Sequence, residues 1–86
     1  MKIIKYGADW CGPCRKLSKI LKESGVDYEE VDINENPEIL ESKEITEIPY
    51  VEVLDDSGRI ILTYKDGFTS EILEELKKKY DTGIIK

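Results

Sequence analysis

The sequence predicts an α/β fold in which a four-stranded mixed sheet is flanked by three helices. The first observation is a strand–helix–strand order, because a helical pattern at about 11–24 stands between β-type runs at 2–6 and 26–33. This order implies a crossover connection and a parallel pair of strands. The second observation is a pair of β-rich runs, 50–54 and 59–64, separated by Asp, Asp, Ser and Gly, which is typical of an antiparallel hairpin.

The first helix is expected to bury one apolar face and to expose a basic one. Its apolar positions repeat at helical spacing and are Pro13, Leu17, Ile20 and Leu21. Arginine and lysine residues occupy the other side of this pattern. Gly25 stands where a glycine commonly ends a helix in the left-handed conformation. We therefore expect the helix to end at about Ser24.

Two shorter helical patterns complete the chain. Asn36 followed by Pro37 predicts the start of a short helix that runs to about Lys43, with Asn36 as its cap. Thr69 or Ser70 is expected to cap the last helix. The apolar face of that helix consists of Ile72, Leu73, Leu76 and Tyr80. The predicted order of elements is therefore βαβαββα.

The composition is typical of a soluble domain. The 86 residues are 40% hydrophobic and 37% charged, and no repeat or linker interrupts them, so we expect one domain over 1–86 with a frayed tail at 81–86. No run approaches ~18 apolar residues, the length of a membrane span, and the charged amino end does not resemble a signal peptide. A net charge of −6 argues against nucleic-acid binding, which needs a basic face. We expect a cytoplasmic monomer that binds neither nucleic acid nor membrane.

Both cysteines lie in one short segment, Trp10-Cys11-Gly12-Pro13-Cys14, between the first strand and the first helix. Unpaired N–H groups and the positive end of the helix dipole stabilise a thiolate at such a position. In a reducing compartment, a Cys-X-X-Cys pair is more often catalytic than structural. A zinc site needs about four ligands, which two cysteines and no histidine cannot supply within one chain. The spacing therefore predicts a redox-active pair and no metal.

This five-residue motif resembles the active site of the thioredoxin-like family, and the resemblance extends over most of the chain. It implies the minimal version of the thioredoxin-like fold, with the strands in the order 2-1-3-4. In that family the first cysteine attacks a substrate disulfide and the second resolves the mixed disulfide. The resemblance therefore makes Cys11 the nucleophile and Cys14 the resolving cysteine. Trp10, Gly12 and Pro13 would support them, with Trp10 also contacting substrate.

The resemblance implies a second site element at Ile48-Pro49. In the family the corresponding proline is cis and lies beside the cysteine pair, where the residue before it offers its backbone to an extended substrate. Gly67 matches a family glycine that leaves room for the substrate. From the residues alone, Pro49 could equally be an edge-strand proline that leaves no hydrogen bond unmet.

Lys5 and Glu30 depart from the family pattern. Thioredoxins typically carry a buried aspartate where Lys5 stands and a lysine where Glu30 stands, and the aspartate assists proton transfer at the resolving cysteine. Here the two charges are exchanged. The pair could be a structural contact between adjacent strands. Alternatively, Glu30 relays the proton of Cys14, or the positive charge of Lys5 lowers the pKa of Cys14. Gly7 and Tyr50 also depart from the family, which usually has Trp and Thr there.

The resemblance implies a dithiol–disulfide oxidoreductase of thioredoxin type that reduces protein disulfides. Such a protein binds no cofactor and receives electrons from NADPH through a flavoprotein such as thioredoxin reductase. One alternative is a glutaredoxin-like donor, linked to glutathione or to ribonucleotide reductase, although Gly-Pro stands between the cysteines where glutaredoxins commonly have Pro-Tyr. Another alternative is a thioredoxin-like binding module in which redox turnover is incidental.

Overall fold

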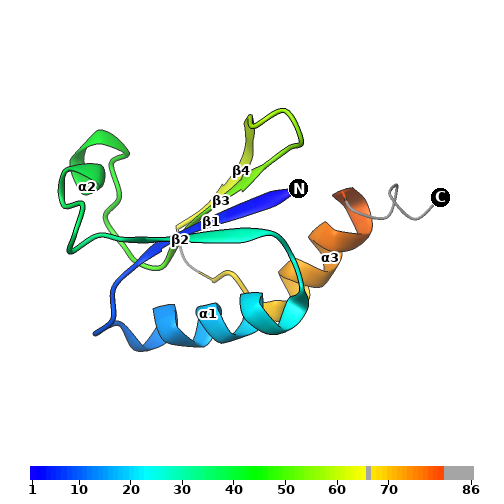
Figure 1. The fold of residues 1–86 in the computed structure, drawn as a ribbon, viewed down its shortest axis with the longest axis horizontal. Coiled ribbons are helices and arrows are strands. Elements are labelled where there is room, and N and C mark those ends of the chain that lie inside the picture. Colours follow the sequence, from blue (N-terminus) through cyan, green and yellow to red (C-terminus); the bar gives the residue numbers. More distant parts are fainter. Residues whose placement is uncertain (66, 81–86) are drawn as a thin grey trace.

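The computed structural model describes residues 1–65 and 67–80, so the expectation for the tail at 81–86 lies outside the described residues. The elements along the described chain (Figure 1) are β1 (Lys2–Gly7), α1 (Gly12–Ser24), β2 (Tyr28–Asp32), α2 (Glu38–Ser42), β3 (Tyr50–Leu54), β4 (Ile60–Tyr64) and α3 (Ser70–Tyr80). The strands form a sheet in the order β2-β1-β3-β4. β1 is parallel to β2 and antiparallel to β3, which is antiparallel to β4. The predicted fold and strand order are confirmed.

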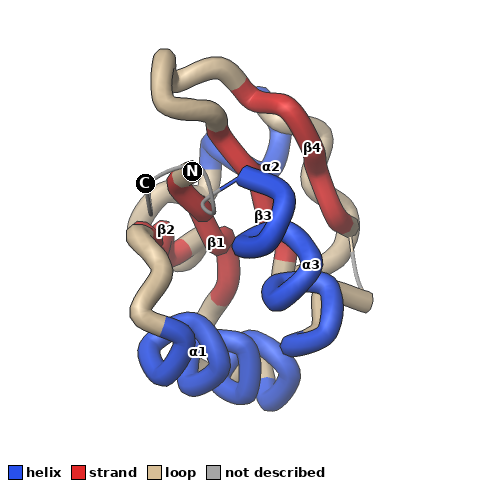
Figure 2. The backbone as a smooth tube through the Cα atoms, turned by 90° about the vertical axis from the view of Figure 1, so that its right-hand side faces the viewer, coloured by secondary structure: helices blue, strands red, loops and turns tan. Residues whose placement is uncertain are grey.

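The helices cover both faces of the sheet. α1 and α3 lie on one face and α2 lies on the other (Figures 1 and 2). Because side chains alternate along a strand, β1 serves both layers: Ile3 packs with residues of α1 and α3, and Tyr6 packs with residues of α2. Lys5, two residues after Ile3, also faces α1, where it contacts Ser18. β1 therefore links the larger core to the layer that contains the cysteines.

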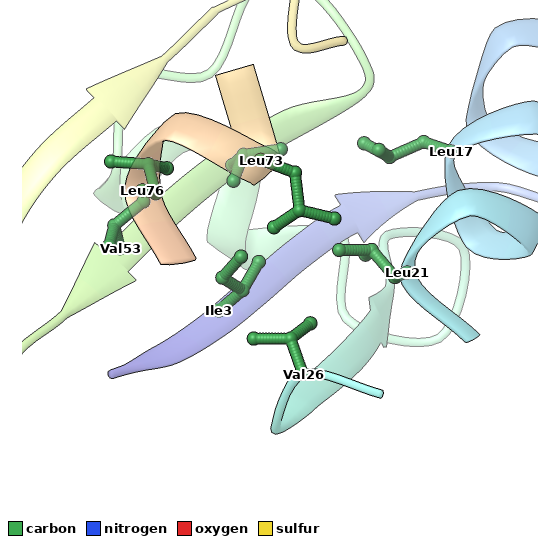
Figure 3. Packing of buried hydrophobic residues seen from close by; sticks show 8 residues of the cluster. Ile3, Leu17, Leu21, Val26, Val53, Leu73 and Leu76 are labelled. Atoms are coloured by element: carbon green, nitrogen blue, oxygen red, sulfur yellow. The ribbon is translucent and has the colours of Figure 1, made fainter. Parts of the chain in front are cut away.

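The larger core lies between the sheet and the pair α1 and α3 (Figure 3). Its buried members are Ile3, Leu17, Leu21, Val26, Val51, Val53, Leu73 and Leu76. The expectation that Pro13 belongs to the buried face of α1 is wrong, because Pro13 is exposed and Cys14 is buried with Leu17 and Leu21. Positions i, i+3 and i+7 share one face of a helix, so the buried face begins at the second cysteine.

The helix ends follow the sequence in part. Gly25 ends α1 with a φ of 76°, in the left-handed region. The hydroxyl of Thr69 caps α3 by accepting a hydrogen bond of 3.2 Å from its first turn. The prediction that Asn36 caps α2 is wrong: the cap position is Pro37, which has no side-chain cap bond. The side-chain amide of Asn36 instead donates to the carbonyl of Asp32 at 3.1 Å.

A buried carboxylate connects α2 to the sheet. Glu52 is 3% exposed, and its two oxygens accept hydrogen bonds from the Tyr6 hydroxyl at 2.8 Å and from the Lys43 ammonium at 2.9 Å. Lys43 directly follows α2, so this network fixes the end of that helix against β1 and β3. Burial, and then the hydrogen bond to Glu52 and its negative charge, raise the pKa of Tyr6 far above the ordinary value.

The raised pKa of Tyr6 predicts a loss of stability at alkaline pH. The unfolded chain releases the Tyr6 proton near pH 10, about the ordinary value, whereas the folded protein retains it. The contribution of the neutral phenol is therefore complete below about pH 10 and is lost as the pH rises toward the folded value. In Tyr6→Phe, the unfolding free energy should fall less steeply above about pH 10 than in the wild type, as measured by urea denaturation. Tyr28→Phe, which removes the same hydroxyl group from β2, is the comparison variant. A Tyr6→Phe slope equal to that of Tyr28→Phe would contradict the prediction.

Candidate active site

The two cysteines form a disulfide at the start of α1, with their Cα atoms 5.2 Å apart. Cys11 is the cap residue of the helix, and its Sγ accepts a hydrogen bond of 3.2 Å from the N–H of Cys14. Gly12 and Pro13 occupy the first turn, where the missing N–H of proline breaks no helical hydrogen bond. In the reduced protein, the same N–H group would stabilise a thiolate on Cys11.

The two cysteines differ in their surroundings. Cys11 is 7% exposed and Cys14 is 1% exposed, so Cys11 is the more accessible of the pair. Trp10, just before Cys11, is 68% exposed. The Sγ of Cys11 lies 4.0 Å from the carbonyl oxygen of Ile48. Cys11 is therefore the more accessible sulfur and stands next to an exposed residue, Trp10, and near a backbone carbonyl, while Cys14 is fully buried.

A groove of about 400 Å³ begins beside the cysteines. The Ile48–Pro49 peptide bond is cis, and both residues line the groove. The groove is also lined by Pro13 at the start of α1 and by Gly67, whose φ is 72°. The groove thus brings together four of the residues that the sequence indicated: Pro13, Ile48, Pro49 and Gly67. Phe68 also lines it, and sequence reasoning did not assign that ring to the site.

Lys5 is a buried lysine behind Cys14. It is 4% exposed, and its Nζ donates to the Cys14 carbonyl oxygen at 3.1 Å and to the Ser18 hydroxyl. It also forms an ion pair with Glu30, with 3.3 Å between Nζ and Oε1. Lys5 and Glu30 are register partners on β1 and β2, and the Glu30 side chain is 42% exposed. The structure therefore brings Lys5 to Cys14 and leaves Glu30 at the solvent side of the ion pair.

Neither a metal site nor a membrane-spanning helix is found in the described residues. Across 1–65 and 67–80, no group of three or more His, Cys, Asp or Glu side chains is placed to hold a metal ion. Over the same described ranges, none of the helices has the length and apolar character that crossing a membrane requires.

Comparison with known proteins identifies the family. Residues 3–53 match the family model described as Glutaredoxin. The chain belongs to the glutaredoxin family of thioredoxin-like proteins. It is 32% identical over 62 residues to a thioredoxin of Staphylococcus aureus, a match that covers 65% of this chain and 60% of that protein. The chain thus matches less than two thirds of the length of these curated relatives.

Solved structures support this family assignment. Thioredoxin 1 of the thermophile Thermosipho africanus is 27% identical, and the alignment covers all of both chains with a TM-score of 0.74. The oxidised thioredoxin of Plasmodium falciparum is 28% identical, with 92% of this chain and 79% of that chain covered and a TM-score of 0.70. The fold of this glutaredoxin-family chain is therefore similar to that of thioredoxins over nearly its whole length.

Sequence reasoning also missed two residues around Cys14 and Lys5. Ser18, which contacts Lys5, lies one turn after Cys14 on the same face of α1, so the i, i+4 spacing could have indicated it. Gly7 was noted only as a departure from thioredoxins. A Cβ at Gly7 would lie 2.8 Å from the Sγ and 3.1 Å from the Cβ of Cys14. Glycine is therefore needed at the end of β1 for Cys14 to pack against the strand.

Gly7→Ala should destabilise the protein by about 1–3 kcal/mol, because the added methyl group forces β1 or the first turn of α1 to shift. Urea denaturation of the oxidised protein measures this cost. Gly12→Ala is the matched control, since a Cβ there would meet no atom within 4 Å and the change should stay within about 0.5 kcal/mol. Equal stability of the two variants would show that Cys14 does not pack against Gly7 as described.

Proposed function

We propose that the protein is a dithiol–disulfide oxidoreductase that reduces disulfides of other proteins. The observation that carries this proposal is the Cys11–Cys14 disulfide at the start of α1, with Cys11 Sγ 4.0 Å from the Ile48 carbonyl oxygen. A pair that closes within one helical turn can open and close without rearranging the fold. Family membership and the thioredoxin relatives support the same chemistry.

The reaction transfers two electrons from the dithiol to the substrate disulfide. The Cys11 thiolate attacks one sulfur of that disulfide, a mixed disulfide forms, and the other substrate sulfur leaves as a thiolate. The Cys14 thiolate then attacks Cys11 Sγ, which closes the Cys11–Cys14 bond and releases the second substrate thiol. The N–H of Cys14 that donates to Cys11 Sγ favours both steps, because it stabilises negative charge on Cys11 as nucleophile and as leaving group.

The groove beside the cysteines is our proposed binding site for the substrate chain. An extended segment there would run past the backbone of Ile48 and Pro49 toward Gly67. The exposed Trp10 ring would contact the substrate from the other side of Cys11. Gly12 would let the substrate backbone approach, since its missing side chain leaves open space.

We further propose that a flavoprotein such as thioredoxin reductase returns the electrons from NADPH, with no cofactor bound to this chain. We propose that the protein acts as a monomer in the cytoplasm. A reducing compartment is the setting in which a Cys-X-X-Cys pair is commonly catalytic.

A glutathione-linked reaction is the second candidate, and the match to the Glutaredoxin model over residues 3–53 favours it. The groove also has one feature that suits this anionic tripeptide: Lys16 of α1 lines it and supplies an ammonium group. The Gly-Pro sequence between the cysteines favours the thioredoxin-type reaction instead. The same assay can separate the two candidates.

NADPH oxidation with a protein disulfide substrate should proceed with thioredoxin reductase and be much slower with glutathione and glutathione reductase. The expected preference rests on the motif and on the thioredoxin relatives. Each arm needs a control without the protein, which sets the background rate. Turnover mainly in the glutathione arm would transfer the function to the second candidate, and turnover in neither arm would contradict both.

Serine variants should separate the roles of the two cysteines. Cys11→Ser should abolish turnover, because no nucleophile remains at the accessible position. Cys14→Ser should accumulate a mixed disulfide between Cys11 and the substrate, visible as a larger species on a non-reducing gel. Retained turnover in Cys11→Ser, or full function of both variants in cells, would instead support the binding-module alternative.

A further inference from the structure

The buried lysine of β1 lies unusually close to the resolving cysteine. Lys5 Nζ is 3.1 Å from the carbonyl oxygen of Cys14 itself. The position that a Cβ of Gly7 would occupy lies 2.8 Å from Cys14 Sγ and 3.5 Å from Lys5 Cε, so the two side chains flank the same small space. Cys14 is 1% exposed and Lys5 is 4% exposed. Because both side chains are buried, solvent screens the positive charge at Cys14 less than it would at the surface.

We propose that the Lys5 ammonium favours the thiolate form of Cys14 and thereby speeds the attack of Cys14 on the mixed disulfide at Cys11. The proposal rests on the proposed function. Cys14 releases its proton to solvent, its sulfur forms the bond to Cys11 Sγ, and the bond between Cys11 and the substrate sulfur breaks, with its electron pair leaving on the substrate. Lys5 transfers no proton in these steps. It is a positioning residue, because it acts through Cys14.

Other charged groups lie near Lys5 and also act on the ionisation of Cys14. A pocket of about 230 Å³ that Lys5 and Gly7 line is also lined by Asp9, Arg15, Glu30 and Asp32. Asp9 and Arg15 are exposed to solvent, which screens them. On the α2 side, Lys43 and Glu52 neutralise each other, and Tyr6 stays neutral because its pKa is raised. Glu30, which pairs with Lys5 at 3.3 Å, and Asp32, which is partly buried, are therefore the opposing charges.

The expected size of the effect follows from thiolate chemistry. If loss of the Lys5 charge moves the titration of Cys14 by one unit, the thiolate fraction at neutral pH falls about tenfold. The more basic thiolate is about threefold more nucleophilic, given a Brønsted slope of ~0.4–0.5, so the attack slows by about threefold. At a pH above the titration range of Cys14, the variant should react faster than the wild type. The Cys14 thiol is then fully ionised in both proteins, and the thiolate of the variant is the better nucleophile.

The test begins in a Cys11→Ser background, in which Cys14 is the remaining thiol, as it is in the mixed disulfide. Ultraviolet absorbance of the thiolate reports the titration of Cys14, with Cys11→Ser/Cys14→Ser as the blank. Lys5→Met should move the titration to higher pH, because it removes the positive charge and keeps the side-chain length. Glu30→Gln should move it to lower pH, because it removes the opposing negative charge. A merely structural ion pair would not give shifts of opposite sign.

The second measurement is the rate at which Cys14 resolves a preformed mixed disulfide, followed over pH in proteins with both cysteines. The Lys5→Met rate should be about threefold lower at neutral pH and should exceed the wild-type rate at alkaline pH. An unmoved titration in Lys5→Met, or shifts of the same sign in both variants, would overturn the proposal. If Lys5→Met does not fold, as judged by circular dichroism, Glu30→Gln decides alone, and an unmoved or higher titration overturns it. The titration requires neither substrate nor reductase, so its failure is distinguishable from failure of the proposed function.

Discussion

The close approach of Cys14 to Gly7 is the constraint on which the site depends. A Cβ at Gly7 would lie 2.8 Å from Cys14 Sγ, so only glycine lets the first turn of α1 pack directly on the end of β1. Further along the same face, Leu17 and Leu21 are 2% and 0% exposed and fix α1 against the larger core. Hydrophobic packing of α1 therefore sets the position of Cys14, and with it that of Cys11 at the start of the helix.

The sheet carries a buried charge on each face, and partners compensate both. Lys5, 4% exposed, faces α1 and pairs with Glu30, whereas Glu52, 3% exposed, faces α2 and accepts from Tyr6 and Lys43. Removing Glu30 or Lys43 leaves a buried charge without its ion-pair partner, which is strongly destabilising. Both networks therefore constrain the arrangement of the elements. They differ in position: Lys5 reaches the backbone of the resolving cysteine, while the Glu52 network holds the end of α2.

Patterns along the chain predicted the element order and the cysteine pair, because both depend on neighbouring residues. The prediction that Asn36 caps α2 was wrong. Capping rules consider bonds between a side chain and the helix that follows it, whereas the Asn36 amide donates to the carbonyl of Asp32, which precedes it in the chain. Pairing of Lys5 with Glu30 could be predicted, since parallel strands place them in register. The contact between Gly7 and Cys14 could not, because it depends on how closely α1 approaches the sheet. The groove likewise combines segments that are distant in sequence.

The two sulfurs need different means of carrying negative charge, and the fold supplies them separately. Cys11 lies at the helix cap, where the N–H of Cys14 can stabilise its thiolate while substrate approaches from solvent. In the reaction that we propose, that N–H faces a neutral sulfur once a substrate is bound to Cys11, and the attacking charge forms on Cys14, which is 1% exposed. Burial alone disfavours a thiolate there. Support for the second step must therefore come from inside the protein, and Lys5, contacting Cys14 from β1, is placed to give it.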